Sequence, residues 1–207
     1  MKWLKLQDWI FLLCAAVVVF VGGGCNDDSG NPLVPPISNA VGNEVMVDAS
    51  DYYEWAYFSF SKGDTVTVED AGSSLDWDLG LRRYHFRTNS GVSGSGEGAA
   101  INIGLMAFDS LTVAPDSGYV VDDSLTVPQM GGSITFPASA VLEDWCDMDM
   151  STMPPICTPT NNIFVLKTSD GKYVKVWFKS YYNPEGPSGH ITLQYLYQPN
   201  GSQDLAE

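Results

Sequence analysis

The stretch NIFVLKTSDGKYVKVWFKSYY, residues 162–182, decides the fold class. Apolar and polar residues alternate along both of its arms, as they do in strands that bury one face. The arms are joined by TSDGK, residues 168–172, and Asp-Gly between two alternating runs predicts a β-hairpin. The same alternation recurs in EVMVDAS (44–50), YFSFSKG (57–63), DTVTVED (64–70), LGLRRYHFRTN (79–89), AAINIGLMAF (99–108), SLTVA (110–114), GSITFPA (132–138) and HITLQYLYQP (190–199). The chain is therefore predicted to be all-β.

The first 25 residues, MKWLKLQDWIFLLCAAVVVFVGGGC, have the layout of a secretory signal. A basic start precedes an apolar run too short for a confident membrane span. Three glycines then lead into Cys25, which resembles the lipobox of bacterial lipoproteins; a plain signal peptide is the alternative. We expect a lipoprotein signal at 1–24 and a lipidated Cys25. Asn26 in place of Asp favours the outer membrane, at the cell surface.

The rest of the chain divides by composition. Residues 25–45 are rich in Pro, Asn, Gly and Ser, and we interpret them as the lipidated cysteine and a flexible tether. Residues 46–200 would form one all-β domain, and 201–207 a polar C-terminal tail.

The charge balance excludes one class of partner. The chain carries 25 acidic and 10 basic residues, a formal net charge of −15. Nucleic-acid binding depends on Lys and Arg that neutralise phosphates, so nucleic acid is not expected as a partner.

The other cysteines of the exported chain, Cys146 and Cys157, form an even pair at short spacing, which predicts a disulfide. A loop of that length would stabilise the fold by about 3 kcal/mol in the chain-entropy model.

Catalytic residues are not evident. His85 and His190 are the two histidines of the chain, and neither lies in a pattern that pairs a nucleophile with a base. Asp76 and Asp78 are interpreted as solvated charge on an acidic surface. The glycine-rich stretch NSGVSGSGEGAA, residues 89–100, lacks the lysine of a phosphate-binding loop. We expect a protein that is not an enzyme.

The segment CDMDMSTMPPIC, residues 146–157, concentrates thioether sulfur between the two cysteines. Met148, Met150 and Met153 can fill gaps beneath a closed loop, a common structural use of methionine. Thioethers are also soft ligands that suit Cu(I) or haem iron. The spacing alone leaves these possibilities open.

The run from 47 to 100 carries a resemblance that bears on this choice. Its blocks DAS, YFSFSKG, LDWDLGLRRY and the glycine-rich loop resemble the HmuY family of bacterial haem-binding lipoproteins, and the similarity returns at 164–182 and 191–197. The resemblance implies a sandwich-like antiparallel β domain with hairpin fingers, acting as a haemophore. Such a protein holds haem (iron protoporphyrin IX) between hairpins and passes it to a TonB-dependent outer-membrane receptor for iron acquisition.

The resemblance also implies two axial ligands to the haem iron, His or Met, in the region where this chain has no histidine. Counting back from Phe164 puts one ligand at Met150, and VPQMGGS (127–133) nominates Met130 for the other. Met148, Met153 and His190 are alternative ligands.

The rest of the haem slot is predicted from neighbouring residues. Trp145, Ile134 and Phe136 would help to line it, and Lys167 or Lys172 would meet the propionates. Two other functions stay open: a structural or adhesive surface lipoprotein with this fold and no haem site, and a Cu(I)-binding lipoprotein that uses its methionines.

Overall fold

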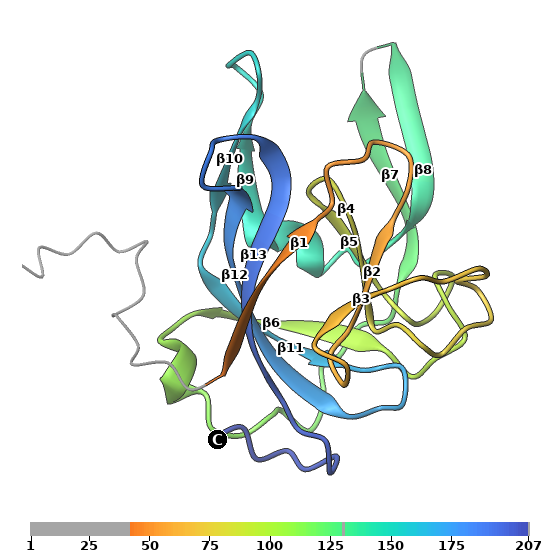
Figure 1. Ribbon diagram of the computed structural model, residues 1–207, viewed down its shortest axis with the longest axis vertical. Coiled ribbons are helices and arrows are strands. Elements are labelled where there is room, and N and C mark those ends of the chain that lie inside the picture. The colour runs from red at the N-terminus through yellow and green to blue at the C-terminus, as the bar shows by residue number, and fades with distance from the viewer. Residues whose placement is uncertain (1–41, 130, 207) are drawn as a thin grey trace, which may run out of the picture. The chain divides into compact units, whose positions relative to one another are not determined.

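The computed structural model describes residues 42–129 and 131–206 (Figure 1). The predicted signal, Cys25, most of the tether and Met130 therefore lie outside the described residues. The strands are β1 (Asn43–Asp48), β2 (Ala56–Ser59), β3 (Asp64–Val66), β4 (Leu79–Arg82), β5 (His85–Thr88), β6 (Ala99–Leu105), β7 (Asp123–Gln129), β8 (Gly132–Ala138), β9 (Cys146–Asp149), β10 (Ile156–Pro159), β11 (Asn162–Lys167), β12 (Tyr173–Tyr182) and β13 (Ser188–Tyr197). Two short 3₁₀ helices, η1 (Phe108–Ser110) and η2 (Leu142–Trp145), lie between strands. The all-β prediction is confirmed.

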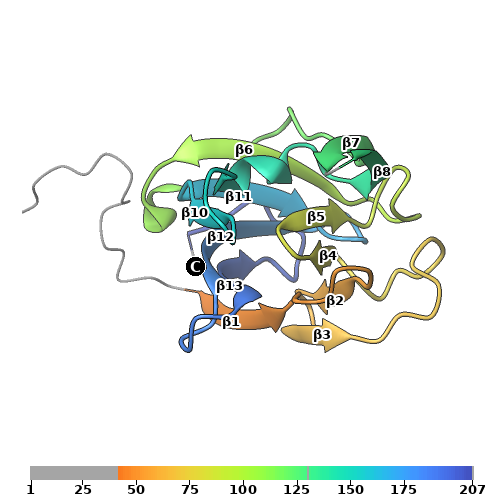
Figure 2. The same ribbon diagram turned by 90° about the horizontal axis from the view of Figure 1, so that it is seen from above.

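The larger sheet contains the stretch that decided the fold class. Its order is β1-β13-β12-β11-β6, with every neighbouring pair antiparallel (Figure 2). The predicted hairpin joins β11 to β12, whose last pair is Lys167 with Tyr173. Gly171 has φ +77°, a left-handed conformation that glycine adopts at little cost. The Asp-Gly signal therefore predicted this turn correctly.

The smaller sheet has the order β3-β2-β4-β5 and corrects one prediction. The run 79–89, interpreted as one strand, is a hairpin in which Arg82 pairs with His85. The chain reverses at Arg83, which has φ +54° without being glycine. The guanidinium of Arg83 donates to the carbonyl oxygens of Ser50 (2.9 Å) and Ser188 (3.3 Å), and these contacts hold the turn in place.

Two further segments differ from expectation. Residues 110–114, predicted as a strand, are not one: Ser110 ends η1, and the rest is irregular apart from a single bridge between Val113 and Asp204. Residues 146–157, interpreted as a closed loop, begin and end in paired strands β9 and β10. At 110–114 tertiary contacts override the local pattern, since Leu205 of the C-terminal segment is fully buried and donates its backbone N–H to the Thr112 carbonyl.

The two larger sheets bury one core between them. Its centre is aromatic: the Phe86 ring lies 4.5 Å from that of Phe178 and 5.1 Å from that of Trp145. Each such side chain contributes about 1.5–3 kcal/mol when it leaves water. Along the described ranges, no helix is long and apolar enough to cross a membrane.

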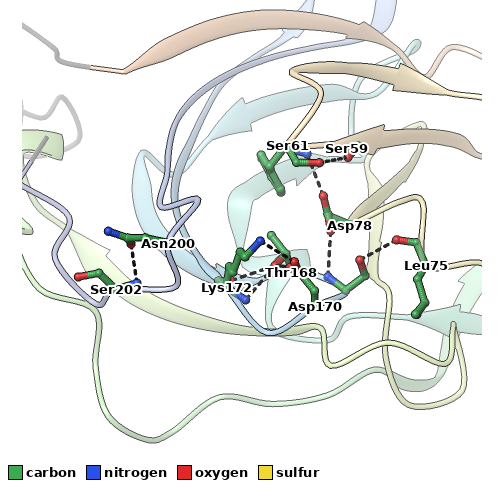
Figure 3. A network of polar contacts seen from close by, with 11 residues as sticks. Ser59, Ser61, Leu75, Asp78, Thr168, Asp170, Lys172, Asn200 and Ser202 are labelled. Atoms are coloured by element: carbon green, nitrogen blue, oxygen red, sulfur yellow. Dashed lines mark hydrogen bonds and ion pairs between the residues drawn. The ribbon is translucent and has the colours of Figure 1, made fainter.

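A buried carboxylate ties the smaller sheet to the β11–β12 turn. Asp78 is 5% exposed and accepts backbone N–H groups from Phe60 (2.8 Å) and Ser169 (2.9 Å). Figure 3 shows it between Ser59 and Ser61 on one side and Thr168 and Asp170 on the other. The interpretation of Asp78 as solvated charge is therefore wrong. Its carboxylate is a structural cross-link.

Candidate ligand-binding cleft

The β7–β8 and β9–β10 hairpins project at the same end of the fold, apart from one another (Figure 1). Residues of both hairpins line a cleft of about 540 Å³. Val127, Pro128, Ile134 and Phe136 line it from the first hairpin. Met148, Pro154 and Pro155 line it from the second. Both walls are therefore largely apolar, and the volume lies within the range of about 300–1,000 Å³ usual for small-molecule sites.

The floor of the cleft is the turn of the β4–β5 hairpin. Arg82, Arg83, Tyr84 and His85 all line it. The remaining lining residues come from the loop after β1, from the end of β12 and from the start of β13: Tyr52, Tyr53, Tyr181 and Ser188.

His85 is fixed at the base of the cleft by two contacts. Its Nδ1 atom lies 2.9 Å from Oε2 of Glu143, which follows Leu142 in η2. Its ring lies edge-on to Phe136 at 4.9 Å between centroids. The sequence indicated no catalytic pairing for His85, and the structure places it in the cleft, where it links the floor to the β8 wall.

The arginines on the floor stack on aromatic rings. The Arg82 guanidinium carbon lies 4.5 Å from the centre of the Trp55 ring and 4.6 Å from that of Phe136. Arg83 lies 4.5 Å from the ring centre of Tyr52. Stacking of this kind holds a cation in place while leaving its charge available.

The sulfur-rich segment contributes one methionine to the cleft. Met148 lines it and also packs against the main core. Met150 is 68% exposed and Met153 88% exposed, and neither lines the cleft. The Cys146–Cys157 disulfide is confirmed and joins the two strands of this wall, with Cα atoms 5.8 Å apart.

Other residues predicted for the slot lie elsewhere. His190 is on β13, its Nε2 atom 3.7 Å from Oδ1 of Asp48, and it does not line the cleft. Trp145 is 1% exposed in the core and donates its indole N–H to the Tyr84 carbonyl at 2.9 Å. It therefore supports the floor from beneath.

The lysines predicted to meet propionates do not line the cleft either. Lys167 stacks over Tyr119 at 4.9 Å, and Lys172 forms an ion pair with Asp170 at 2.8 Å. The arginines that line the cleft are Arg82 and Arg83, which were not predicted from the sequence as ligand-binding residues. Two adjacent arginines among only 10 basic residues were a signal that could have found them.

Two other hollows are chemically different. One, about 580 Å³, runs along β1 to β3 and is lined in part by Asp48, Glu54 and Asp64. The other, about 140 Å³, lies beside the Asp78 cross-link. Within 42–129 and 131–206, no three His, Cys, Asp or Glu side chains are grouped so as to hold a bare metal ion.

The donor set of the hairpin cleft fits haem in three respects. Its two walls offer an apolar slot for a porphyrin. Met148 offers a thioether, a known type of axial ligand to haem iron. Arg82 and Arg83 offer positive charge for carboxylates. These properties occur together in this cleft and in neither of the other two hollows.

Comparisons with known proteins show what this chain is similar to in sequence and fold. The family model described as HmuY protein matches residues 51–195. A candidate HmuY-like haem-binding protein from Bacteroides vulgatus is 28% identical, with a TM-score of 0.60 over 75% of this chain and 91% of that one. A candidate lipoprotein from Bacteroides fragilis is also 28% identical, with a TM-score of 0.60 over 75% and 90%. The apo HmuY analogue of Tannerella forsythia shares the fold at 21% identity, with a TM-score of 0.62 over 77% and 97%. No curated protein sequence matches this chain.

Proposed function

Because this chain belongs to the HmuY family, a family of haem-binding proteins, we propose that it binds haem in the cleft between the β7–β8 and β9–β10 hairpins. One observation carries the proposal: the cleft combines apolar walls, a thioether and two arginines in about 540 Å³. In this role the protein binds its ligand without catalysing a reaction.

The iron ligands are proposed to be methionines, one from each hairpin. From β9 the geometry favours Met148 over Met150, because Met148 lines the cleft whereas Met150 is 68% exposed. As the second ligand the proposal keeps Met130, which follows Gln129 in the sequence and lies outside the described residues. Neutral thioethers stabilise ferrous over ferric iron, so we expect reduced haem to bind more tightly.

The cellular role is proposed from the family and from the leader. We infer a lipoprotein anchored through Cys25 in the outer membrane, which captures haem and passes it to a TonB-dependent receptor. The similarity to a candidate lipoprotein of Bacteroides fragilis supports the anchor. The net charge of −15 suits a small-molecule cargo better than nucleic acid.

A spectral titration tests the proposal. Haemin is added to the purified full-length chain in mild detergent, with and without dithionite, and the Soret region is recorded. We expect a shifted Soret band with low-spin features, at lower haem concentration in the reduced sample.

A flat titration in both redox states at micromolar concentrations would overturn haem binding. The fold would then serve a structural or adhesive role. Copper(I) uptake that depends on Met148 and Met153 would instead indicate the copper-binding alternative.

A further inference from the structure

The residues that line the hairpin cleft have a different charge balance from the chain as a whole. The chain has 25 acidic and 10 basic residues. The residues that line the cleft nevertheless include Arg82 and Arg83 and no Asp or Glu. A cleft with apolar walls focuses the field of such charges, because little water lies between them and a bound ligand. In an acidic protein this local reversal of sign favours an anionic ligand.

Arg82 is partly buried, and its guanidinium contacts aromatic rings and no polar group among the described residues. Its guanidinium is stacked against Trp55 and Phe136. Over the described ranges it makes no ion pair and no hydrogen bond. Desolvation lowers the pKa of Arg82 below its usual value, with no carboxylate to offset it. Five N–H donors are therefore held in place without acceptors from the described residues.

Arg83, its neighbour, is held differently. It donates to the backbone carbonyls of Ser50 and Ser188 and, at 2.8 Å, to the Ser188 hydroxyl. These acceptors are neutral, so they fix the side chain without cancelling its charge. Arg83 thus adds a rigid positive charge beside Arg82, while the donors of Arg82 stay available.

We propose that Arg82 is the anion-binding residue of the cleft and pairs with a carboxylate of the ligand, with Arg83 providing a second, fixed positive charge. A guanidinium matches a planar carboxylate through two parallel N–H···O bonds. This inference rests on the proposed function, in which the carboxylate is a haem propionate. It assigns to Arg82 the role that the sequence suggested for Lys167 or Lys172.

The test compares haemin with its dimethyl ester, which keeps the porphyrin and iron but lacks both carboxylates. Both ligands are titrated in the same detergent into the full-length chain, into Arg82→Gln and Arg82→Lys, and into Lys62→Gln. Lys62 makes a matched control because Gln removes the same charge from an exposed site, 4.0 Å from Asp76 and away from the cleft. Near-ultraviolet circular dichroism establishes that each variant is folded.

We expect Arg82→Gln to weaken haemin binding about 10- to 100-fold, the usual range for a hydrogen-bonded charge pair. The affinity for the dimethyl ester should change less than about threefold, and Lys62→Gln should leave both affinities unchanged. Arg82→Lys, which keeps the charge but loses the planar fork, should fall between the wild-type protein and Arg82→Gln.

Two outcomes would overturn the anion-binding role while leaving haem binding intact. In one, Arg82→Gln and Arg82→Lys weaken the acid and the ester equally, so Arg82 contributes packing alone. In the other, the wild-type protein and Arg82→Gln bind haemin equally well. If neither ligand binds the wild-type chain, haem binding itself fails, and the role of Arg82 fails with it.

Discussion

The β4–β5 hairpin carries polar groups of opposite status at its two ends. We call the end remote from the turn, which is enclosed within the fold, the closed end, and the turn, which lines the cleft, the open end. At the closed end, Asp78 and Asn89 have their hydrogen-bonding atoms occupied: Asp78 by two backbone N–H groups, and Asn89 by the carbonyls of Ser74 and Trp77 and the N–H of Gly96. At the open end, Arg82 makes no hydrogen bond within the described ranges. The two ends lie only four residues apart along the chain, at Asp78 and Arg82.

This difference separates structural polar groups from groups that are available to a ligand. A buried polar atom with partners strengthens the fold, whereas one held in place without partners is destabilising unless a ligand supplies them. The motif LDWDLGLRRY, 75–84, thus encodes a cross-link at its start and the floor of the cleft at its end. Variants at the closed end should act on stability, and variants at the open end on binding.

The largest expected effect is at the closed end. Asp78→Ala should lower the free energy of unfolding by about 4 kcal/mol, since two buried N–H groups lose their acceptor at about 1–3 kcal/mol each. Chemical denaturation of the full-length chain measures this. Asp76→Ala is the matched control, because Asp76 is exposed in the same motif, and it should change stability by less than about 0.5 kcal/mol. Equal losses in the two variants would contradict the cross-link.

The second effect concerns the pH dependence of stability. Asp122, just before β7, accepts hydrogen bonds from the N–H (2.8 Å) and hydroxyl (2.7 Å) of Thr88 at the closed end. Burial raises the pKa of Asp122 to about 6, despite these bonds. The folded state therefore holds this proton more tightly than the unfolded state does. The contribution of Asp122 to the free energy of unfolding is therefore greatest below about pH 4, and it falls as the pH rises to about 6.

Asp122→Asn isolates this contribution, because the amide stands in for the neutral acid. Relative to the wild-type protein, the variant should gain up to about 3 kcal/mol of stability between pH 4 and pH 7. Urea unfolding at several pH values measures the difference. Asp123→Asn removes an exposed charge from the next residue and serves as the control. The two proteins differ in their free energy of unfolding. If that difference stayed constant over this pH range, Asp122 would not titrate with the raised pKa.

Sequence predicted the features that depend on neighbours along the chain. The β11–β12 turn follows from Asp170 and Gly171, and the disulfide follows from two cysteines at short spacing in a chain predicted to be exported. The reversal at Arg83 could not be predicted in this way. Its positive φ is held by contacts with Ser50 and with Ser188, 105 residues away in sequence.

The cleft was only partly predictable for the same reason. The family resemblance predicted a slot between hairpins. Ile134 and Phe136, which were expected to line it, do line the cleft. It could not supply the floor, because Arg82 and His85 reach the β8 wall only after β4 and β5 have paired. Counting back from Phe164 favoured Met150 as the iron ligand. In the structure, Met148 of β9 lines the cleft, whereas Met150 and Met153 do not.

The smallest expected effect tests that methionine at the open end. Met148→Ala should weaken the binding of ferrous haem about 10- to 100-fold, equivalent to about 1.4–2.7 kcal/mol, because one axial ligand is lost. Met150→Ala should change it less than about threefold, and Met153→Ala, at an 88% exposed position, is the matched control. Met148→His should restore binding and shift the preference toward ferric haem, since imidazole favours the oxidised iron more than a thioether does. Dithionite-reduced and oxidised titrations measure all four variants. A larger loss in Met150→Ala than in Met148→Ala would mean that the β9–β10 hairpin closes further over haem than it does in this structure, so that the ligand predicted from sequence would be the correct one.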